Sequence, residues 1–431
     1  MTRATTTLAH PTRREFLSLA LAPLLASCSA RSNDAVVRFW AMGREGEVVA
    51  GLLPNFERTH PGIRVQVQQL PWTAAHEKLL TAFAGDALPD LCQLGNTWIP
   101  EFAAVNALEP LDERVRSSSV VQADDYFAGI WDTNRIDGAL LGVPWYIDTR
   151  LLFYRRDILA QAGFTRPPGS WAEWTEMLSA VKRVVGANRY AILLPLNEFE
   201  PLLALALQQD EPLLRDGGRY GNFRSAGFRH ALSFYVDTFR RGFAPPLTNA
   251  DISNVWNEFA RGYYSFYVSG PWNIGEFERR LPAGLQDAWM TAPLPGPHGP
   301  GASIAGGSSL VLFRAARHKE AAWQLIEYLS RPDVQRTFYA ATRDLPPRRT
   351  VWREAALAND MHTAAFGDQL ERVRSAPKVP EWERIATEMG LTAERVVHGD
   401  WSIDRALDEL DARTDRILEK RRYLLSRGGH G

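Results

Sequence analysis

The sequence predicts an α/β fold in which helices flank mostly parallel sheets. Strand-like and helical segments alternate from residue 35 to residue 94, an order typical of a parallel sheet covered by helices. The chain has 431 residues, which favours two or three domains over one. Two extended runs follow each other between Leu140 and Asp157, after a Gly-Val-Pro bend. We interpret this region as the place where the chain crosses from one lobe to another.

The composition is typical of a globular protein that buries a core, with 45% hydrophobic and 23% charged residues. The net charge of −1 argues against a nucleic-acid-binding protein. The 14 tryptophans are unusual, because tryptophan is normally among the rarest residues. Such a surplus favours indole rings that are kept for binding.

The first 27 residues have the pattern of a signal peptide, which is not part of the mature fold. Arg13 and Arg14 precede an apolar run from Phe16 to Ala26, which is shorter than the about 20 residues of a membrane-spanning helix. The twin arginines indicate export in the folded state, and the alternative is an ordinary positive n-region. Leu25-Ala26-Ser27-Cys28 resembles a lipobox, so we expect Cys28 to be acylated. The alternative is an ordinary secretory signal with a chance cysteine.

The first strands are expected at residues 35–40, 62–70 and 90–94, with helices at 47–58 and 73–84 between them. In parallel sheets, ligands bind beyond the carboxyl ends of the strands. This rule points to the loop at 41–46 and to the loop at 95–98. In the second loop, Asn96 and Thr97 can form hydrogen bonds with hydroxyl groups, and Trp98 offers a flat ring for stacking. A core position after a helix start is the alternative for Trp98.

Two aromatic rings, Trp145 and Tyr146, lie close in the sequence to the carboxylate of Asp148 and the hydroxyl of Thr149. Aromatic rings cover the apolar faces of a sugar ring, and a carboxylate accepts hydrogen bonds from sugar hydroxyls. Trp98, Trp145, Tyr146 and Trp272 all fall in loops or at strand ends. Core packing is the alternative for each ring alone, but four rings in such places favour a carbohydrate site.

The second half of the chain mixes helices and strands. Ser170 and Glu173 have the spacing of a helix capping box. Residues 304–309 are expected to form a flexible turn. Helices are expected at 170–185, 202–208, 228–240, 254–260, 319–330 and 337–345, strands at 190–194, 263–268, 289–294 and 310–313, and mostly helix at 351–421.

The sequence shows no motif for metal or phosphate binding and no nucleophile elbow. We therefore expect no metal and no cofactor, and we interpret Cys92 as a small core residue. One enzymatic alternative remains, glycoside hydrolysis by carboxylates among Asp148, Glu198 and Glu200. Binding requires only rings and planar polar groups, so we do not expect an enzyme.

Short motifs follow one another in a specific order and spacing. They are Phe39-Trp40, the run 78–85 with Pro89-Asp90, the runs 143–149 and 153–157, Ser170-Trp171, Gly270-Pro271-Trp272, the run 293–296, Gly306-Gly307, and the runs 319–323 and 345–348. With these motifs the chain, from Val36 to about Arg349, resembles the extracellular solute-binding proteins of family 1. These proteins serve carbohydrate ABC importers, and maltose-binding protein is one of them.

The resemblance implies two α/β lobes, each with a mostly parallel sheet flanked by helices, joined by a hinge of three crossings. The crossings are expected near residues 147–150, 289–291 and 311–313. Sugar would bind in the cleft, and the lobes would close over it by hinge bending. The implied division is a signal peptide at 1–27, a tether at 28–34, an N-terminal lobe at 35–147 and 290–311, and a C-terminal lobe at 148–289 and 312–431.

The resemblance also implies the ligand contacts. They are Arg44, Glu45, Asn96, Trp98, Tyr146, Asp148, Glu198, Phe199, Trp272, Gly306, Gly307 and Arg348. One pyranose ring cannot contact four aromatic side chains, so we expect the ligand to be a disaccharide or short oligosaccharide. An α-glucoside such as maltose or trehalose is the first expectation.

The implied partners are a small-molecule sugar and the membrane subunits of an ABC permease with their ATPase. The protein is expected to be an exported monomer, in the periplasm or on the outer face of the cytoplasmic membrane. It would touch the membrane only through the lipid on Cys28. Two alternatives remain, the hydrolase described above and a sugar receptor that feeds a sensor.

Overall fold

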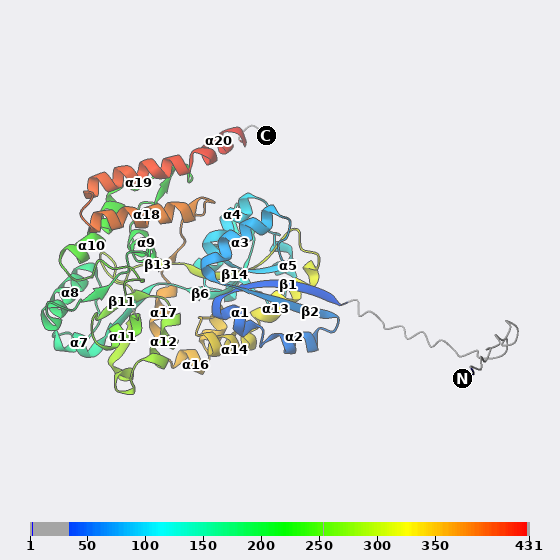
Figure 1. Ribbon diagram of the computed structural model, residues 1–431, viewed down its shortest axis with the longest axis horizontal. Coiled ribbons are helices and arrows are strands. Elements are labelled where there is room, and N and C mark those ends of the chain that lie inside the picture. Colours follow the sequence, from blue (N-terminus) through cyan, green and yellow to red (C-terminus); the bar gives the residue numbers. More distant parts are fainter. Residues whose placement is uncertain (1, 3–33, 253, 429–431) are drawn as a thin grey trace.

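Two β-sheets, each with its own helices, form the two halves of the molecule (Figure 1). The structure is a computed structural model that describes residues 2, 34–252 and 254–428. The predicted signal peptide apart from residue 2, the lipobox with Cys28 and nearly all of the tether lie outside these residues.

The first sheet has the strand order β2-β1-β3-β14-β6. Strand β1 runs parallel to β2 and β3, whereas β14 runs antiparallel to β3 and β6. The strands are β1 (Ala35–Met42), β2 (Ile63–Leu70), β3 (Leu91–Gly95), β6 (Val143–Asp148) and β14 (Gly306–Leu312). The helices of this half are α1 (Gly43–Val49), α2 (Leu53–Thr59), α3 (Trp72–Ala84), α4 (Ile99–Ala104), α5 (Asp112–Ser117), α6 (Ala128–Asp132), α13 (Lys319–Ser330) and α14 (Pro332–Thr342).

The second sheet has the strand order β12-β7-β11-β8. In this sheet only the β11–β8 pair is parallel, whereas β7 pairs with β11 and with β12 in antiparallel fashion, so the expectation of a mostly parallel sheet is wrong for this half. The strands are β7 (Leu151–Arg155), β8 (Ile192–Leu193), β11 (Phe266–Ser269) and β12 (Trp289–Ala292). The remaining helices are α7 (Arg156–Gln161), α8 (Trp171–Val185), α9 (Glu200–Leu207), α10 (Ala226–Arg240), α11 (Val255–Ala260), α12 (Trp272–Arg280), α15 (Arg349–Trp352), α16 (Ala355–Ala358), α17 (Ala364–Leu370), α18 (Trp382–Val397), α19 (Ile403–Ile417) and α20 (Glu419–Gly428).

Short elements complete the fold. They are the strand pairs β4 (Arg135–Ile136) with β5 (Ala139–Leu140), β9 (Leu214–Arg215) with β10 (Tyr220–Gly221), and β13 (Ser303–Ile304) with β15 (Val373–Arg374), and the 3-10 turns η1 (Asn96–Trp98), η2 (Ala123–Asp125) and η3 (Ala283–Ala288). The β13–β15 pair matters for the site, because it ties residue 304 to the segment that leads into α18.

The longest predicted helices are confirmed. Helices α3, α8, α10 and α13 occupy the ranges that the apolar spacing indicates. The predicted cap of α8 is present, because the Ser170 hydroxyl accepts a hydrogen bond from the Glu173 backbone N–H at 3.3 Å. Cys92 is buried in β3, as expected of a core residue.

The expected loop at 41–46 is instead the end of β1 and the first turn of α1. The strand continues because Met42 still pairs with Leu70 and its N–H donates to the Gln93 side chain at 2.7 Å. Arg44 and Glu45 therefore lie on a helix that starts directly at the end of the strand.

The expected flexible turn at 304–309 is also incorrect, because β14 begins at Gly306. A Cβ atom at Gly307 would lie 2.3 Å from the Tyr146 carbonyl oxygen, and one at Gly306 would lie 2.5 Å from the Asp148 carbonyl oxygen. Gly307 also has φ of +129°, a conformation that L side chains avoid. The two glycines allow β14 to pack tightly against β6, which makes them part of a rigid sheet.

The chain crosses between the halves three times. The first crossing lies between β6 and β7, at Thr149 and Arg150, as the sequence indicates. The second does not lie at 289–291, since β12 belongs to the second sheet, but between β12 and β14. The third does not lie at 311–313 but after α14, where Leu345 bridges to Ile147.

These crossings change the expected lobe boundaries. Helices α13 and α14 pack on the first sheet, where Trp323, Leu325 and Phe338 join the core around Trp145. Residues 312–342 therefore do not fit the second half, to which the sequence assigned 312–431. Apolar spacing shows which face of a helix is buried, but it does not identify the sheet that covers that face.

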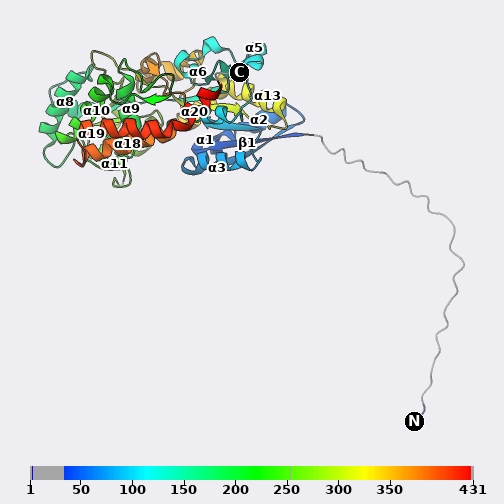
Figure 2. The ribbon, with the colours of Figure 1, turned by 90° about the horizontal axis from the view of Figure 1, so that it is seen from above.

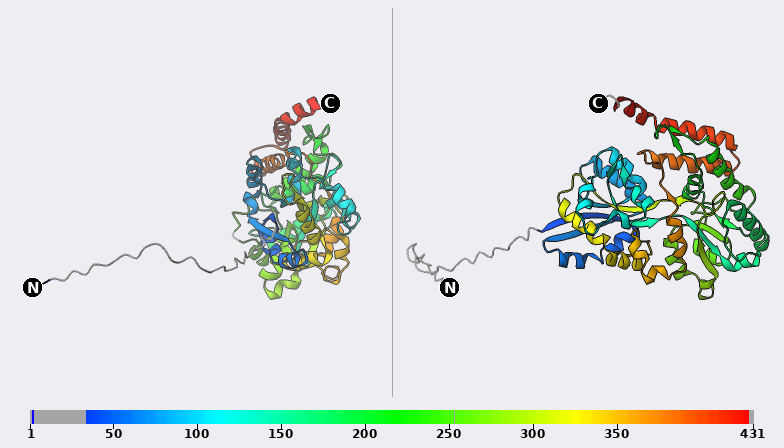
Figure 3. Two further views of the ribbon diagram at one scale, coloured as in Figure 1. Left: turned by 90° about the vertical axis from the view of Figure 1, so that its right-hand side faces the viewer. Right: turned by 180° about the vertical axis from the view of Figure 1, so that it is seen from behind.

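The last helices lie on the outside of the second half. Helices α18 and α19 pack on each other and on α10. Seen from above and from behind, they run along one surface, and α20 continues from them toward the first half (Figures 2 and 3). Within the described residues, none of the helices combines the length and apolarity that crossing a membrane requires.

The contact between Trp145 and Phe338 tests the position of α14. Their rings are stacked at 4.6 Å, and Trp145 is 2% exposed. We expect Trp145→Ala to lower the free energy of unfolding by about 3–5 kcal/mol, because it leaves a cavity between β6 and α14. Urea denaturation followed by circular dichroism measures this loss. Leu391→Ala, at a half-exposed site, is the control, and an equal loss in both variants would contradict the packing.

Candidate functional site

A cavity of about 670 Å³ lies where the two halves meet. Its walls on the first half come from α1, the start of α3, η1, the end of β6 and the start of β14. Its walls on the second half come from the first crossing and from α9, α12 and α18. The site thus lies beyond the carboxyl ends of β1, β3 and β6, as the rule for parallel strands predicts.

The structure brings together ten of the twelve predicted contacts. Those that line the cavity are Arg44, Glu45, Asn96, Trp98, Tyr146, Asp148, Phe199, Trp272, Gly306 and Gly307. The sequence interpretation omitted several other lining residues, chiefly Trp72, Arg150, Leu203, Glu276, Arg279, Ser308, Thr342, Asp344 and Glu383.

Three indole rings face the cavity, on Trp72, Trp98 and Trp272. Trp72 and Trp98 pack edge to face at 5.6 Å on the first half. Trp272 lies on the second half and is 37% exposed, with the Arg150 guanidinium 4.7 Å from its ring centre. Trp145, which the sequence favoured as a ring of the site, is instead buried against Phe338.

The position of Trp272 follows from its local sequence. The ring folds back over Gly270, where a Cβ atom would lie only 1.8 Å from a ring carbon. Glycine at 270 and the first turn of α12 therefore present the indole to the cavity. Rings from both halves then face the same space, which is the arrangement that a flat, partly apolar guest requires.

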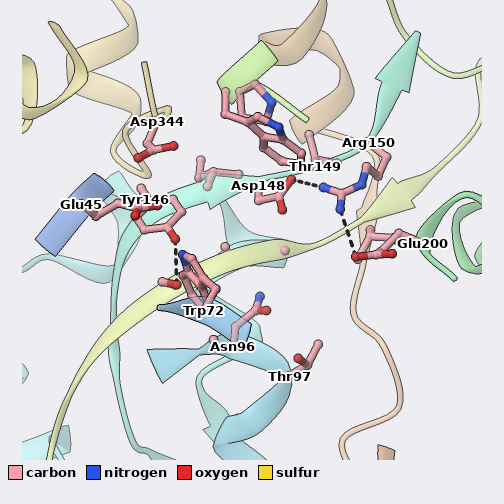
Figure 4. A pocket seen from close by; sticks show the side chains of 18 of the residues that line it. Glu45, Trp72, Asn96, Thr97, Tyr146, Asp148, Thr149, Arg150, Glu200 and Asp344 are labelled. Atoms are coloured by element: carbon pink, nitrogen blue, oxygen red, sulfur yellow. Dashed lines mark hydrogen bonds and ion pairs between the residues drawn. The ribbon is translucent and has the colours of Figure 1, made fainter. Parts of the chain in front are cut away.

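Arg150 joins the two halves at the base of the cavity (Figure 4). Its guanidinium donates to the Asp148 carboxylate at 2.6 Å and to the Glu200 carboxylate at 3.0 Å. Arg150 is only 7% exposed. Burial works against the charged guanidinium, but Asp148 and Glu200 together raise its pKa above the ordinary value. Burial also raises the pKa of Asp148, and Arg150 opposes that shift.

Two further acidic side chains lie around Tyr146. Glu45 from α1 and Asp344 from the segment after α14 both line the cavity and are both more than nine-tenths buried. Burial raises the pKa of Glu45 and raises that of Asp344 well above its ordinary value. The Tyr146 hydroxyl accepts hydrogen bonds from Gln93 and Ser308, both at 3.1 Å.

Helix α18 supplies Glu383, which reaches the first half from the C-terminal part of the chain. Burial raises the pKa of Glu383, while a hydrogen bond with Thr97 and the nearby His76 oppose the shift. His76 is paired with Glu101 at 2.7 Å and lies against the Trp98 ring at 4.9 Å. A helix far along the chain thus contributes one carboxyl group to the cavity wall.

Two predicted contacts lie outside the cavity. Glu198 accepts a hydrogen bond from the Asn249 side chain at 2.7 Å and does not line the wall. Arg348 is buried and binds Asp125 at 2.6 Å and the Ser330 carbonyl oxygen at 2.7 Å. Its role is to hold the third crossing in place, because it joins that segment to the first half.

Some lining residues also have structural partners. The Asn96 amide donates to the Ala305 carbonyl oxygen at 2.8 Å, and the Arg44 guanidinium donates to the Ala341 carbonyl oxygen at 3.0 Å. Asn96 therefore ties η1 to the second crossing, and Arg44 ties α1 to the end of α14. Within the described residues, no group of metal-binding side chains comes together.

Residues 43–336 match the sequence model of a protein family, the bacterial extracellular solute-binding proteins. The chain belongs to this family. This solute-binding protein is 59% identical to the sugar-binding protein MalE of Xanthomonas citri, whose structure it matches with a TM-score of 0.88 over 91% of this chain and 99% of that one. The two-lobe fold and the family resemblance predicted from the sequence are thereby confirmed.

Two more distant relatives carry informative names. The solute-binding protein is 27% identical to a protein of Streptomyces antibioticus named an uncharacterized lipoprotein, over 87% of each chain. It is 23% identical to a maltotriose-binding protein of Pyrococcus abyssi, over 81% of this chain and 74% of that one. The name of the first relative indicates a lipid anchor, and the name of the second indicates that it binds a sugar.

The ion pairs of Arg150 lead to a pH-dependent prediction. In Arg150→Met, Asp148 and Glu200 would remain largely buried without a cation, which we expect to lower the free energy of unfolding by about 3 kcal/mol at pH 7.5. Burial already raises the pKa of Asp148, and loss of the opposing Arg150 cation raises it further, so the deficit is full above the raised value and shrinks as the pH falls to 4.5.

Urea denaturation at the two pH values measures this deficit. The double variant Arg150→Met with Asp148→Asn is the control and should recover part of the stability, because one uncompensated charge is gone. A deficit that is equal at pH 7.5 and pH 4.5 would show that packing, and not charge, causes it.

Proposed function

We propose that the chain is the lipid-anchored binding component of a carbohydrate ABC importer. In this proposal it captures a disaccharide or short oligosaccharide between its halves and delivers the sugar to the membrane permease. The observation that carries the proposal is the cavity itself, in which three indole rings and six carboxyl side chains surround one space. Rings suit the apolar faces of a pyranose, and carboxylates suit its hydroxyl groups.

The size of the cavity supports a small-molecule guest. Its volume of about 670 Å³ falls within the range of roughly 300–1,000 Å³ typical of ligand pockets. Three indoles are more than one pyranose needs, which favours at least two sugar units. The relatives named for sugar and for maltotriose agree with this class, and an α-glucoside such as maltose or trehalose remains our first choice.

The carboxyl groups favour binding over hydrolysis. A glycosidase needs one carboxyl group as acid and another as base or nucleophile across the sugar. Here Asp148 and Glu200 share the Arg150 guanidinium, and Glu198 lies outside the cavity. Asp148 and Glu200 both line the cavity, but each is already bound to the same buried guanidinium, which favours a structural role for this pair over an acid and a base on opposite sides of a sugar.

Calorimetric titration of the purified chain with maltose, trehalose, maltotriose and glucose tests the proposal. We expect a 1:1 response to one of the larger sugars, without formation of product sugars. Trp272→Ala should weaken that response by about 30-fold, because aromatic anchors contribute about 2 kcal/mol or more. Phe83→Ala, which removes a ring of the same 37% exposure that does not line the cavity, should leave the response unchanged.

Two results would reject this assignment. One is the absence of any heat of binding across the sugar panel in a folded protein. The other is a Trp272→Ala variant with the affinity of the unchanged protein, since the indole would then not contact the sugar.

The lipid anchor is tested separately. We expect the exported protein to fractionate with membranes and its N-terminal peptide to carry acyl chains on Cys28 in mass spectra. Cys28→Ala should release the protein into the soluble fraction, because the acyl chains on Cys28 are its proposed attachment to the membrane. The affinity for sugar should stay the same. Soluble protein cleaved at another residue would instead support an ordinary secretory signal.

A further inference from the structure

Two buried carboxyl groups face the cavity without a cation. Glu45 is 9% exposed and Asp344 is 7% exposed, and both line the wall. In the described part of the chain, no ion pair joins either group to an arginine, lysine or histidine. Buried carboxylates are normally paired, because an isolated buried charge is costly. This pair therefore requires an explanation.

The fold holds the two groups on the same side of the cavity. The Arg44 guanidinium donates to the Ala341 carbonyl oxygen, which fixes α1 against the end of α14. The chain then turns at Arg343, whose φ is +66°, and Leu345 bridges to Ile147 beside Tyr146. Figure 4 shows Glu45 and Asp344 next to Tyr146 at one end of the site.

The surroundings of the two groups differ. Glu45 faces the Tyr146 hydroxyl and the Trp72 indole N–H, two donors that favour an ionised carboxylate. Asp344 faces Thr342 on its own segment, with Glu45 and Asp148 as nearby negative groups and Arg44 as a weak opposing charge. Donors thus lie around Glu45, whereas Asp344 meets mostly burial and negative charge, so Asp344 is the group of the two that is favoured in its neutral form.

We propose that Asp344 faces the bound sugar as a neutral carboxylic acid that donates a hydrogen bond to a sugar oxygen, while the Glu45 carboxylate accepts one from a sugar hydroxyl. This inference rests on the proposed function. A neutral acid beside a carboxylate offers one donor and one acceptor, and a hydroxyl group offers the complement of both. A guest that carries its own carboxylate would meet the negative charge of Glu45.

The proposal makes affinity depend on pH in one direction. Below the raised pKa of Asp344 the donor is present, and binding is at full strength. As the pH rises through that value, the donor is lost and a second negative charge appears beside Glu45. Affinity for a neutral sugar then falls, by up to tenfold for each pH unit above the pKa.

The test uses calorimetry with maltose, and with trehalose as a second probe, from pH 6.0 to 9.0. We expect the affinity of the unchanged protein to fall toward the alkaline end of this range, because Asp344 loses its proton as the pH rises. Asp344→Asn keeps a donor that does not titrate, so its affinity should stay within about threefold of the pH 6.0 value throughout. Asp344→Ala should lose about tenfold at pH 6.0, since one hydrogen bond is gone.

Asp368→Asn is the matched control. It makes the same chemical change at a surface carboxylate paired with Arg372, and it should follow the unchanged protein at every pH. An Asp344→Asn variant as weak as Asp344→Ala would overturn the inference and leave sugar binding intact.

Infrared spectroscopy tests the protonation without any sugar. At pH 7 the spectrum should contain the carbonyl band of a neutral carboxylic acid, and Asp344→Asn should remove that band. Absence of the band in the unchanged protein overturns the inference by itself. If the band is present but no sugar binds at any pH, then the proposed function and the hydrogen bond to sugar fall together.

Discussion

The two halves of the protein are held at a shared residue, Arg150. Its carboxylate partners come from different sides, because Asp148 ends β6 of the first sheet and Glu200 opens α9 of the second half. The Ser303 hydroxyl also donates to the Arg150 carbonyl oxygen at 2.6 Å, which joins the first crossing to the second. A buried guanidinium of this kind cannot move far without leaving charges uncompensated. The base of the cavity is therefore the most constrained part of the site.

The rest of the site is built outward from that base. Trp272 lies over the Arg150 guanidinium, and the Trp72 and Trp98 rings face it from the first half. The carboxyl groups outnumber the cations along the wall, and Arg150 is already shared between two of them. A wall rich in hydrogen-bond acceptors suits a guest that is rich in hydroxyl donors, which connects the electrostatics of the solute-binding protein to the proposed class of ligand.

Individual residues show how far the sequence could lead to the site. The strand-end rule found Asn96 and Trp98, which follow a recognisable strand, and the pattern of aromatic rings beside a carboxylate found Tyr146 and Asp148. The sequence favoured Trp145 as a ring of the site, but Trp145 is buried and Trp72 lines the cavity instead. Neighbouring side chains of a strand point to opposite faces, so Tyr146 and Trp145 cannot both face the cavity. The burial of Trp145 depends on α14, which follows nearly 200 residues later in the chain. Asp344 and Glu383 carried no local signal, since both enter the cavity from segments that the chain reaches only after its last crossing.

The sequence by itself determined the α/β class, most of the long helices, the first crossing and the family, because these depend on local periodicity and on short motifs in a constant order. The tertiary structure alone decided which sheet α13 and α14 cover, where the second and third crossings lie, and which carboxyl groups share the cavity. The physical reason is that burial and charge pairing depend on contacts between residues far apart in the chain, such as Glu45 and Asp344 or Arg150 and Glu200, and no local pattern records those contacts.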